Sequence, residues 1–184
     1  MNVMVISSSP NNDGLTAACA AAAAEGARLA GGDVDEVRLN ELQVSACQVC
    51  DRGWGTCLSE HACEKADDFQ LIHARVRQAD AYVIVTPVYW GEMSESAKAL
   101  TDRLRRCEAT LGEGSRLAGK PVIAVAAAGG SGGGMITCLA SMERWTQHTH
   151  ARIFDLIPVN RWTREYKLVT IREAARAMVQ ENRS

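Results

Sequence analysis

The chain has 184 residues, with 22 acidic and 20 basic side chains and a formal net charge of -2. This balance gives no electrostatic reason to expect nucleic acid or an anionic membrane as a partner, so any bound phosphate must be gripped locally. The length fits one domain over residues 1–184, with a core large enough to fold without disulfides.

No basic segment precedes the first apolar run, Val3 to Ile6, and that run is far shorter than a signal-peptide core or a membrane span. We therefore expect a cytoplasmic protein. Its seven cysteines are then expected to be reduced, or in part bound to metal, because disulfide frameworks belong to small exported domains.

Five strand-like runs begin near Met4, Val34, Ala81, Pro121 and Arg152, and stretches with helical spacing separate them. This alternation predicts an α/β fold: a flavodoxin-like, doubly wound parallel sheet of five strands with helices on both faces. Right-handed crossovers commonly give the strand order 2-1-3-4-5. That order places a ligand-binding crevice between the first and third strands.

Helix starts are indicated by capping residues. Asp67 and Asp68 precede a run whose apolar residues have helical spacing, and Ser94 precedes another. Thr170, followed three places later by Glu173, has the capping-box spacing, which predicts that the last helix begins there.

The first strand leads into a loop, Ser7 to Thr16, and then into an alanine-rich stretch ending at Leu29 that predicts a slim helix. Hydroxyl groups, the flexible Gly14 and the amino end of this helix can direct N–H groups and a helix dipole at a dianion. The loop lacks the glycine patterns of nucleotide triphosphate and dinucleotide binders, which disfavours ATP and a tightly bound NAD. On its own, such a loop is more often a plain turn.

Two more loops follow later strands. Thr86 to Gly91 sets two aromatic side chains beside a glycine, where a flat ring would find apolar walls and backbone donors. Ala127 to Gly134 has the glycines that close ligand approach requires. Taken singly, the two loops also fit a sealed sheet edge, a subunit contact or a mobile surface loop. Because loops after parallel strands emerge at one sheet edge, we expect the three to form one site for a planar, phosphorylated ligand, best filled by flavin mononucleotide (FMN).

The motifs S-S-P-N-N-D-G-L-T, T-P-V-Y-W-G-E-M-S and A-A-G-G-S-G-G-G, with the ending R-W-T-R-E-Y-K-L, span nearly the whole chain. Together they resemble the NADPH-dependent FMN reductase family of flavodoxin-like proteins, including its multimeric flavodoxins and iron-sulfur flavoproteins. The FMN-binding residues expected at the three loops are Ser7, Ser9, Asn11, Gly14, Leu15, Thr16, Thr86, Pro87, Val88, Tyr89, Trp90, Gly91, Ala128, Gly129, Gly130 and Gly134. Asn11 stands where the family often has arginine, which would remove a bidentate cation from the phosphate.

The resemblance implies an oxidoreductase in which NAD(P)H reduces FMN and the flavin passes electrons to a quinone, nitroaromatic, free flavin or metal-centre acceptor. The flavin performs the chemistry, so no catalytic acid or base is expected, and Trp90 and Gly91 would lie near the ring. One alternative is a flavodoxin-like or iron-sulfur electron carrier without direct NAD(P)H activity, and another is a flavin-free regulatory module. Multimeric family members imply a homodimer or homotetramer with Trp90 and the glycine loop, Ala127 to Gly134, near the contact.

Residues 40–66 have little periodicity, so something should order them. This segment contains four cysteines with the spacing C-x2-C-x6-C-x5-C: Cys47, Cys50, Cys57 and Cys63. Four thiolates can hold a [4Fe–4S] cluster or a tetrahedral zinc ion, whereas a redox disulfide or ordinary packed thiols are alternatives. The iron-sulfur flavoproteins that the chain resembles typically have two residues, not six, between the second and third cysteines. Trp54 is available as an apolar plug.

The remaining candidates are predicted to be structural. Cys19, Cys107 and Cys138 lie in helical patterns and are expected in the core. We also expect Trp145 and Trp162 to pack in the core, with a pocket wall or a subunit contact as the alternatives. His148 and His150 should lie at a helix end with a poor ligand spacing.

Overall fold

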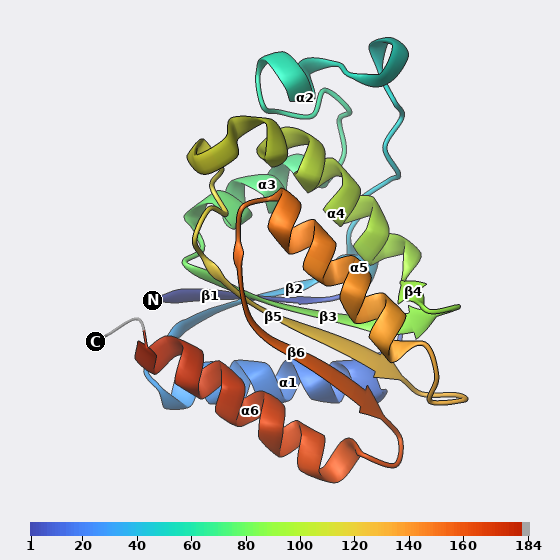
Figure 1. Ribbon diagram of the computed structural model, residues 1–184, viewed down its shortest axis with the longest axis vertical. Coiled ribbons are helices and arrows are strands. Elements are labelled where there is room, and N and C mark those ends of the chain that lie inside the picture. Colours follow the sequence, from blue (N-terminus) through green and yellow to red (C-terminus); the bar gives the residue numbers. More distant parts are fainter. Residues whose placement is uncertain (182–184) are drawn as a thin grey trace.

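The structure, a computed structural model, describes residues 1–181. At its centre lies a parallel sheet with the strand order β2-β1-β3-β5-β6. Figure 1 shows this sheet between two layers of helices. The strands are β1 (Asn2–Ser7), β2 (Asp33–Arg38), β3 (Ala81–Tyr89), β5 (Pro121–Ala128) and β6 (Arg152–Asn160).

The predicted order of the five parallel strands is confirmed, because β4 (Glu92–Met93) is a short additional strand outside that order. It pairs antiparallel with the end of β3, through Val88 with Met93 and Tyr89 with Glu92. The sequence analysis missed β4, since two residues carry no periodicity. The resulting hairpin projects at the sheet edge in Figure 1.

Helices cover both faces of the sheet, as predicted. On one face lie α1 (Leu15–Leu29) and α6 (Arg164–Glu181), and on the other lie α3 (Phe69–Gln78), α4 (Glu95–Glu108) and α5 (Met135–His148). The alanine-rich sequence of α1 allows a close approach to α6: a Cβ atom at Gly26 would lie 2.0 Å from the backbone oxygen of Arg172. Within residues 1–181, no helix is both long and apolar enough to cross a membrane.

Two of the three predicted capping residues of α3 and α4, Asp67 and Ser94, accept hydrogen bonds from the helix starts, whereas Asp68 does not. Asp67 Oδ1 accepts a hydrogen bond from the backbone N–H of Phe69 at 3.0 Å. Asp68 instead uses its carboxylate to accept from the N–H of Gln43, at 2.7 Å, and so holds the preceding loop. Ser94 Oγ accepts from the first turn of α4, as expected.

The predicted start of the last helix is wrong. α6 begins at Arg164, and Thr170 lies inside it with its hydroxyl donating to the carbonyl of Tyr166 at 3.0 Å. The turn before the helix is made by Asn160, whose Oδ1 accepts from the N–H groups of Trp162 and Thr163, both at 3.0 Å. This local turn starts the helix earlier than the capping-box spacing indicated.

The three cysteines predicted to be structural are fully buried. Burial raises the pKa of Cys19, Cys107 and Cys138 to about 12, so these are inert core thiols. Trp145 is also buried, and its Nε1 donates to the carbonyl of Thr101 at 2.9 Å, which joins α5 to α4.

Candidate functional site at the edge of the sheet

The three predicted loops emerge at the same edge of the sheet. β1 and β5 are the two neighbours of β3, and their ends are in register with it: Ser7 pairs with Val85, and Pro87 with Ala127. The structure therefore brings together segments that are about 80 and 40 residues apart in sequence.

The first loop is pinned to its neighbours by Ser8, a residue that the sequence analysis did not single out. The backbone N–H of Ser8 donates to the carbonyl of Val85 at 3.1 Å, and its hydroxyl accepts from Ser94 Oγ at 2.9 Å. The hydroxyl of Thr86, itself fully buried, accepts from the N–H of Ser94 at 3.0 Å. The side chain of Thr86 thus braces the loops from behind, so Thr86 could contact a ligand only through its backbone.

The other end of the first loop is open to an anion. Ser9 and Asn11 are accessible, and the N–H of Asn11 donates to Ser9 Oγ at 3.2 Å. α1 starts after Gly14 with no side-chain cap and no acidic residue in its first turn. The N–H groups of that turn and the helix dipole therefore favour a phosphate there. Thr16 is buried, so its side chain is less available than that of Ser9.

Two hollows lie beside the second loop. The first hollow has a volume of about 360 Å3 and includes Tyr89 in its lining. Its other walls are formed by residues of the first loop, of α4 and of the segment that follows β2. The other, of about 550 Å3, has Trp90, Gly91 and the third loop as its walls. Both volumes are in the range of small-molecule sites. Tyr89 lines the first of these hollows, and Trp90 lines the second.

The second and third loops pack backbone against backbone. A Cβ atom at Gly134 would lie 2.8 Å from Gly91 Cα, and Thr137 Oγ1 donates to the carbonyl of Gly91 at 2.9 Å. Gly91 and Gly134 also have left-handed φ values of 82° and 78°. Glycine is therefore required at both positions, by space as well as by conformation.

The start of the third loop leaves space for a ligand. Nothing lies within 4 Å of a Cβ atom built at Gly129 or Gly130, although Ala128 just before them is buried. Trp162, predicted to be in the core, is 65% exposed. Its ring covers the same loop, since a Cβ atom at Gly132 would lie 2.5 Å from Trp162 Cζ3. No periodic pattern surrounds Trp162 that could have indicated this contact.

A doubly wound sheet with an anion-binding turn after β1 and ligand-sized hollows beside β3 and β5 defines a flavodoxin-like nucleotide-binding protein. The chain belongs to the NADPH-dependent FMN reductase family, whose family model matches residues 1–155. The enzyme class is therefore that of flavin-dependent oxidoreductases, as the sequence motifs implied.

Individual relatives agree with this membership. The chain is 30% identical to an iron-sulfur flavoprotein of Methanosarcina thermophila over 156 residues, covering 83% of this chain and 76% of the relative. It is 28% identical to an iron-sulfur flavoprotein of Methanocaldococcus jannaschii over 145 residues, covering 79% and 71%. An NAD(P)H:quinone oxidoreductase from Methanothermobacter marburgensis has the same fold, with a TM-score of 0.74, 18% identity, and coverage of 97% and 96%.

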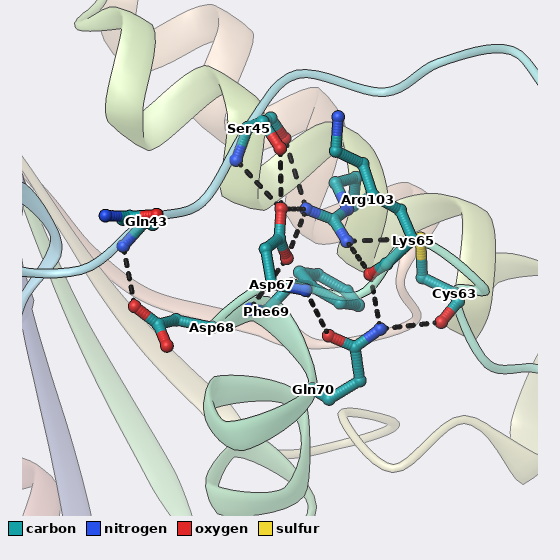
Figure 2. A network of polar contacts seen from close by, with 9 residues as sticks. All are labelled: Gln43, Ser45, Cys63, Lys65, Asp67, Asp68, Phe69, Gln70 and Arg103. Atoms are coloured by element: carbon teal, nitrogen blue, oxygen red, sulfur yellow. Dashed lines mark hydrogen bonds and ion pairs between the residues drawn. The ribbon is translucent and has the colours of Figure 1, made fainter.

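The cysteine segment, residues 40–66, is ordered by a buried arginine that the sequence analysis did not single out (Figure 2). Arg103 of α4 is 1% exposed, and its Nη1 donates to both carboxylate oxygens of Asp67 at 2.9 and 2.7 Å. The same guanidinium donates to the carbonyls of Ser45 and Lys65 and to Cys63 Sγ, each at 3.2 Å. The segment is thus tied to α4 by side chains.

The four predicted metal ligands, Cys47, Cys50, Cys57 and Cys63, line one cavity with Arg103 and Arg106. Its volume is about 20 Å3, which is room for one water molecule. Across residues 1–181, no three Cys, His, Asp or Glu side chains are arranged to hold a metal ion. The donors share a cavity, but as arranged here they do not fit a metal cluster.

The surroundings of two further side chains of the segment, Cys50 in this cavity and Trp54 outside its lining, show what each can do. A hydrogen bond with Glu64, followed by burial, raises the pKa of Cys50 to about 11, which keeps this thiol protonated. Trp54 is 39% exposed. The guanidinium carbon of Arg106 lies over the indole ring of Trp54, 4.6 Å from the centre of that ring. The tryptophan therefore stacks at the surface and does not plug the core.

Proposed function

We propose that the protein is an FMN-dependent oxidoreductase that passes electrons from NAD(P)H to a small-molecule acceptor such as a quinone or a free flavin. One observation carries the proposal. Three loops that the family motifs mark for FMN meet at one sheet edge and leave open space beside Gly129 and Gly130.

Each loop has its own task in this proposal. Because Asn11 stands where the family often has arginine, Ser9, Asn11 and the first turn of α1 would hold the phosphate through hydroxyl and backbone donors. Pro87 to Gly91 would form one wall of the ring site, and Ala128 to Gly134 the other. Bound FMN supplies hydride acceptance and electron donation, and the chain positions it and excludes water from one face.

The backbone contacts of the second loop suit that positioning task. The carbonyl of Gly91 accepts a hydrogen bond from Thr137, and the backbone of Gly134 packs directly against Gly91. The backbone N–H groups of the second loop are therefore fixed in the ligand-free protein. Rigid donors lose little entropy on binding and can set the electronic properties of a flat ring.

Anaerobic stopped-flow mixing of FMN-saturated protein with NADPH, and separately with NADH, tests the proposal. We expect flavin bleaching with at least one of the two nucleotides, followed by reoxidation when a quinone is added. A protein that binds FMN but bleaches with neither nucleotide would be an electron carrier instead. A protein that does not take up FMN would contradict both assignments.

A second candidate function, an electron carrier with a cysteine-bound [4Fe–4S] cluster, is favoured by one observation: all four cysteines of the 40–66 segment line the same cavity. Relatives that are named iron-sulfur flavoproteins support it. Against it, the sulfur atoms are not arranged as metal ligands within residues 1–181. Cluster binding would therefore require the segment to rearrange.

Iron and acid-labile sulfide analysis of protein purified without air separates the two candidates. A cluster carrier would contain both elements, with visible absorbance that survives removal of flavin. Iron-free protein that retains NAD(P)H-dependent flavin reduction would exclude the cluster carrier and leave the reductase as the remaining candidate.

A further inference from the structure

The first loop, residues 7–16, has no positive charge of its own. It contains no lysine or arginine, and Asp13 is its one charged side chain. Backbone N–H groups and the dipole of α1 favour a dianion, but they carry only partial charges. A phosphate bound at this loop therefore has a cationic partner only if another segment of the chain supplies one.

The end of β2 brings an arginine to the loop. Arg38 pairs with Ser7 in the parallel register of β2 and β1, and neighbouring strands are about 4.8 Å apart. Side chains alternate between the two faces along each strand, and Val3 and Val34 pack in the core cluster that α1 covers. Ser7 and Arg38 each lie four residues further along, so they face α1 as well.

A hollow of about 170 Å3 lies between α1, the first loop and the ends of these two strands. It is large enough for a phosphate group, since a single water molecule needs only about a tenth of that space. Polar side chains of its lining are Ser7, Ser9, Asn11, Asn12 and Arg38. The guanidinium of Arg38 thus shares one space with the hydroxyl and amide groups that the loop offers to an anion.

The acidic groups around this hollow leave Arg38 available. The carboxylate of Glu36, which also lines the hollow, pairs with Arg28 of α1 and is thereby neutralised. Arg38 Nη1 lies 2.9 Å from Glu41 Oε1, but both side chains are about half exposed, at 43% and 59%. An exposed pair of this kind contributes little to stability, and it occupies only some of the guanidinium donors. A phosphate dianion, which can accept two parallel N–H bonds, is the stronger partner.

We propose that Arg38 is the cation that binds the FMN phosphate, and that it exchanges Glu41 for the phosphate when FMN binds. This inference rests on the proposed function, because it assigns a residue to the same FMN site. It makes Arg38 a specificity-determining residue. Arg38 favours FMN over riboflavin, which has the same ring system but no phosphate.

Flavin fluorescence titration of the full chain, with FMN and separately with riboflavin, tests this assignment. Arg38→Ala should raise the dissociation constant for FMN at least about tenfold, because the phosphate loses its charged partner. The dissociation constant for riboflavin should stay within about twofold of the unmodified value. Arg38→Lys keeps the charge but not the paired N–H groups, so its FMN affinity should lie between those of Arg38→Ala and the unmodified chain.

Further measurements follow the charge itself. The FMN affinity of the unmodified chain should fall as KCl is added, and that of Arg38→Ala should fall less steeply. Glu41→Gln removes the group that competes with the phosphate, so FMN should bind as tightly as before or up to about threefold more tightly. Phosphorus NMR of bound FMN should show a shifted phosphate resonance in Arg38→Ala, a readout that requires no reaction.

Arg176→Ala is the matched control. Arg176 is also an exposed arginine paired with a glutamate three residues away, Glu173, but it lies near the end of α6. Its removal should leave both flavin affinities unchanged. Circular dichroism checks that each variant is folded, which is expected because Arg38, Glu41 and Arg176 are exposed.

Unchanged FMN affinity in Arg38→Ala, or equal losses for FMN and riboflavin, overturns the role of Arg38 and leaves the FMN assignment standing. Weaker FMN binding in Glu41→Gln overturns the exchange of partners. Uptake of neither flavin by the unmodified chain would instead contradict the proposed function itself.

Discussion

Arg103 and Asp67, which are 36 residues apart, form a buried ion pair that joins α4 to the end of the cysteine segment, with Arg103 Nη1 at 2.7 Å from Asp67 Oδ2. The guanidinium also stacks on Phe69, 4.2 Å from the ring centre. Its Nε is buried and has no hydrogen-bond partner within residues 1–181. The pair is therefore the main polar support of a segment that has little secondary structure of its own.

Asp67→Asn should destabilise the protein by about 3 kcal/mol, because it leaves the Arg103 guanidinium charged and unpaired in the interior. Urea denaturation measures this loss. Asp102→Asn, at an exposed ion pair on α4, is the control and should cost less than about 1 kcal/mol. Equal effects of the two substitutions would refute the assigned role of the buried pair.

Stability should fall in acid because the pKa values of two hydrogen-bonded carboxylates, Asp67 and Glu108, are lowered. Burial acts to raise the pKa of Asp67, but hydrogen bonds from Arg103 and Ser45 outweigh it. For Glu108, burial likewise acts to raise the pKa, and contacts with His73 and the N–H of Arg116 lower it overall. A carboxylate with a lowered folded pKa contributes stability above its unfolded pKa and loses it as the pH falls toward the folded value.

That loss should therefore begin as the pH falls below about 4.5 and continue toward about pH 2. Urea midpoints over this range should drop less steeply in Asp67→Asn and Glu108→Gln than in the unmodified chain. Parallel profiles for all three proteins would show that neither carboxylate is the source.

Gly129→Ala should weaken FMN binding without destabilising the free protein. The added Cβ atom would meet nothing within 4 Å in the protein, so only a ligand against this loop can feel it. We expect the dissociation constant for FMN to rise at least about tenfold in a flavin fluorescence titration. Gly114→Ala, whose Cβ atom would lie 3.9 Å from Leu111 Cβ and away from the sheet edge, is the matched control. Unchanged FMN affinity in Gly129→Ala would place the ring elsewhere.

Gly26→Ala should cost about 3 kcal/mol, since the new Cβ atom would lie 2.0 Å from the Arg172 carbonyl and α1 would have to move away from α6. Thermal unfolding measures the change. The intrinsic preference of alanine for helices acts in the opposite direction, by about 1 kcal/mol. A stabilised variant would therefore mean that α1 and α6 do not pack this closely.

Much of the fold was predictable because its determinants are local. The strands at Ala81 and Pro121 are apolar runs of ordinary length, and α1 ends at Leu29, where the alanine-rich stretch ends. The predicted start of α6 at Thr170 failed because a capping box indicates a helix start only when no earlier turn begins the helix. Here Asn160 supplies that turn. Trp162 was misplaced for a related reason, since its contact with Gly132 joins two irregular segments.

The sequence by itself determined the family, the strand order and the three loops, since each is encoded in a contiguous run of residues. The tertiary structure alone decided how those loops are arranged. Ser8 and Thr86 both accept hydrogen bonds from Ser94 and so hold the first two loops together. Tyr89 and Trp90 line different hollows. It also decided that Arg103 orders the cysteine segment. The physical reason is that hydrogen bonds and ion pairs between residues 36 to 86 positions apart depend on packing, which no local pattern records.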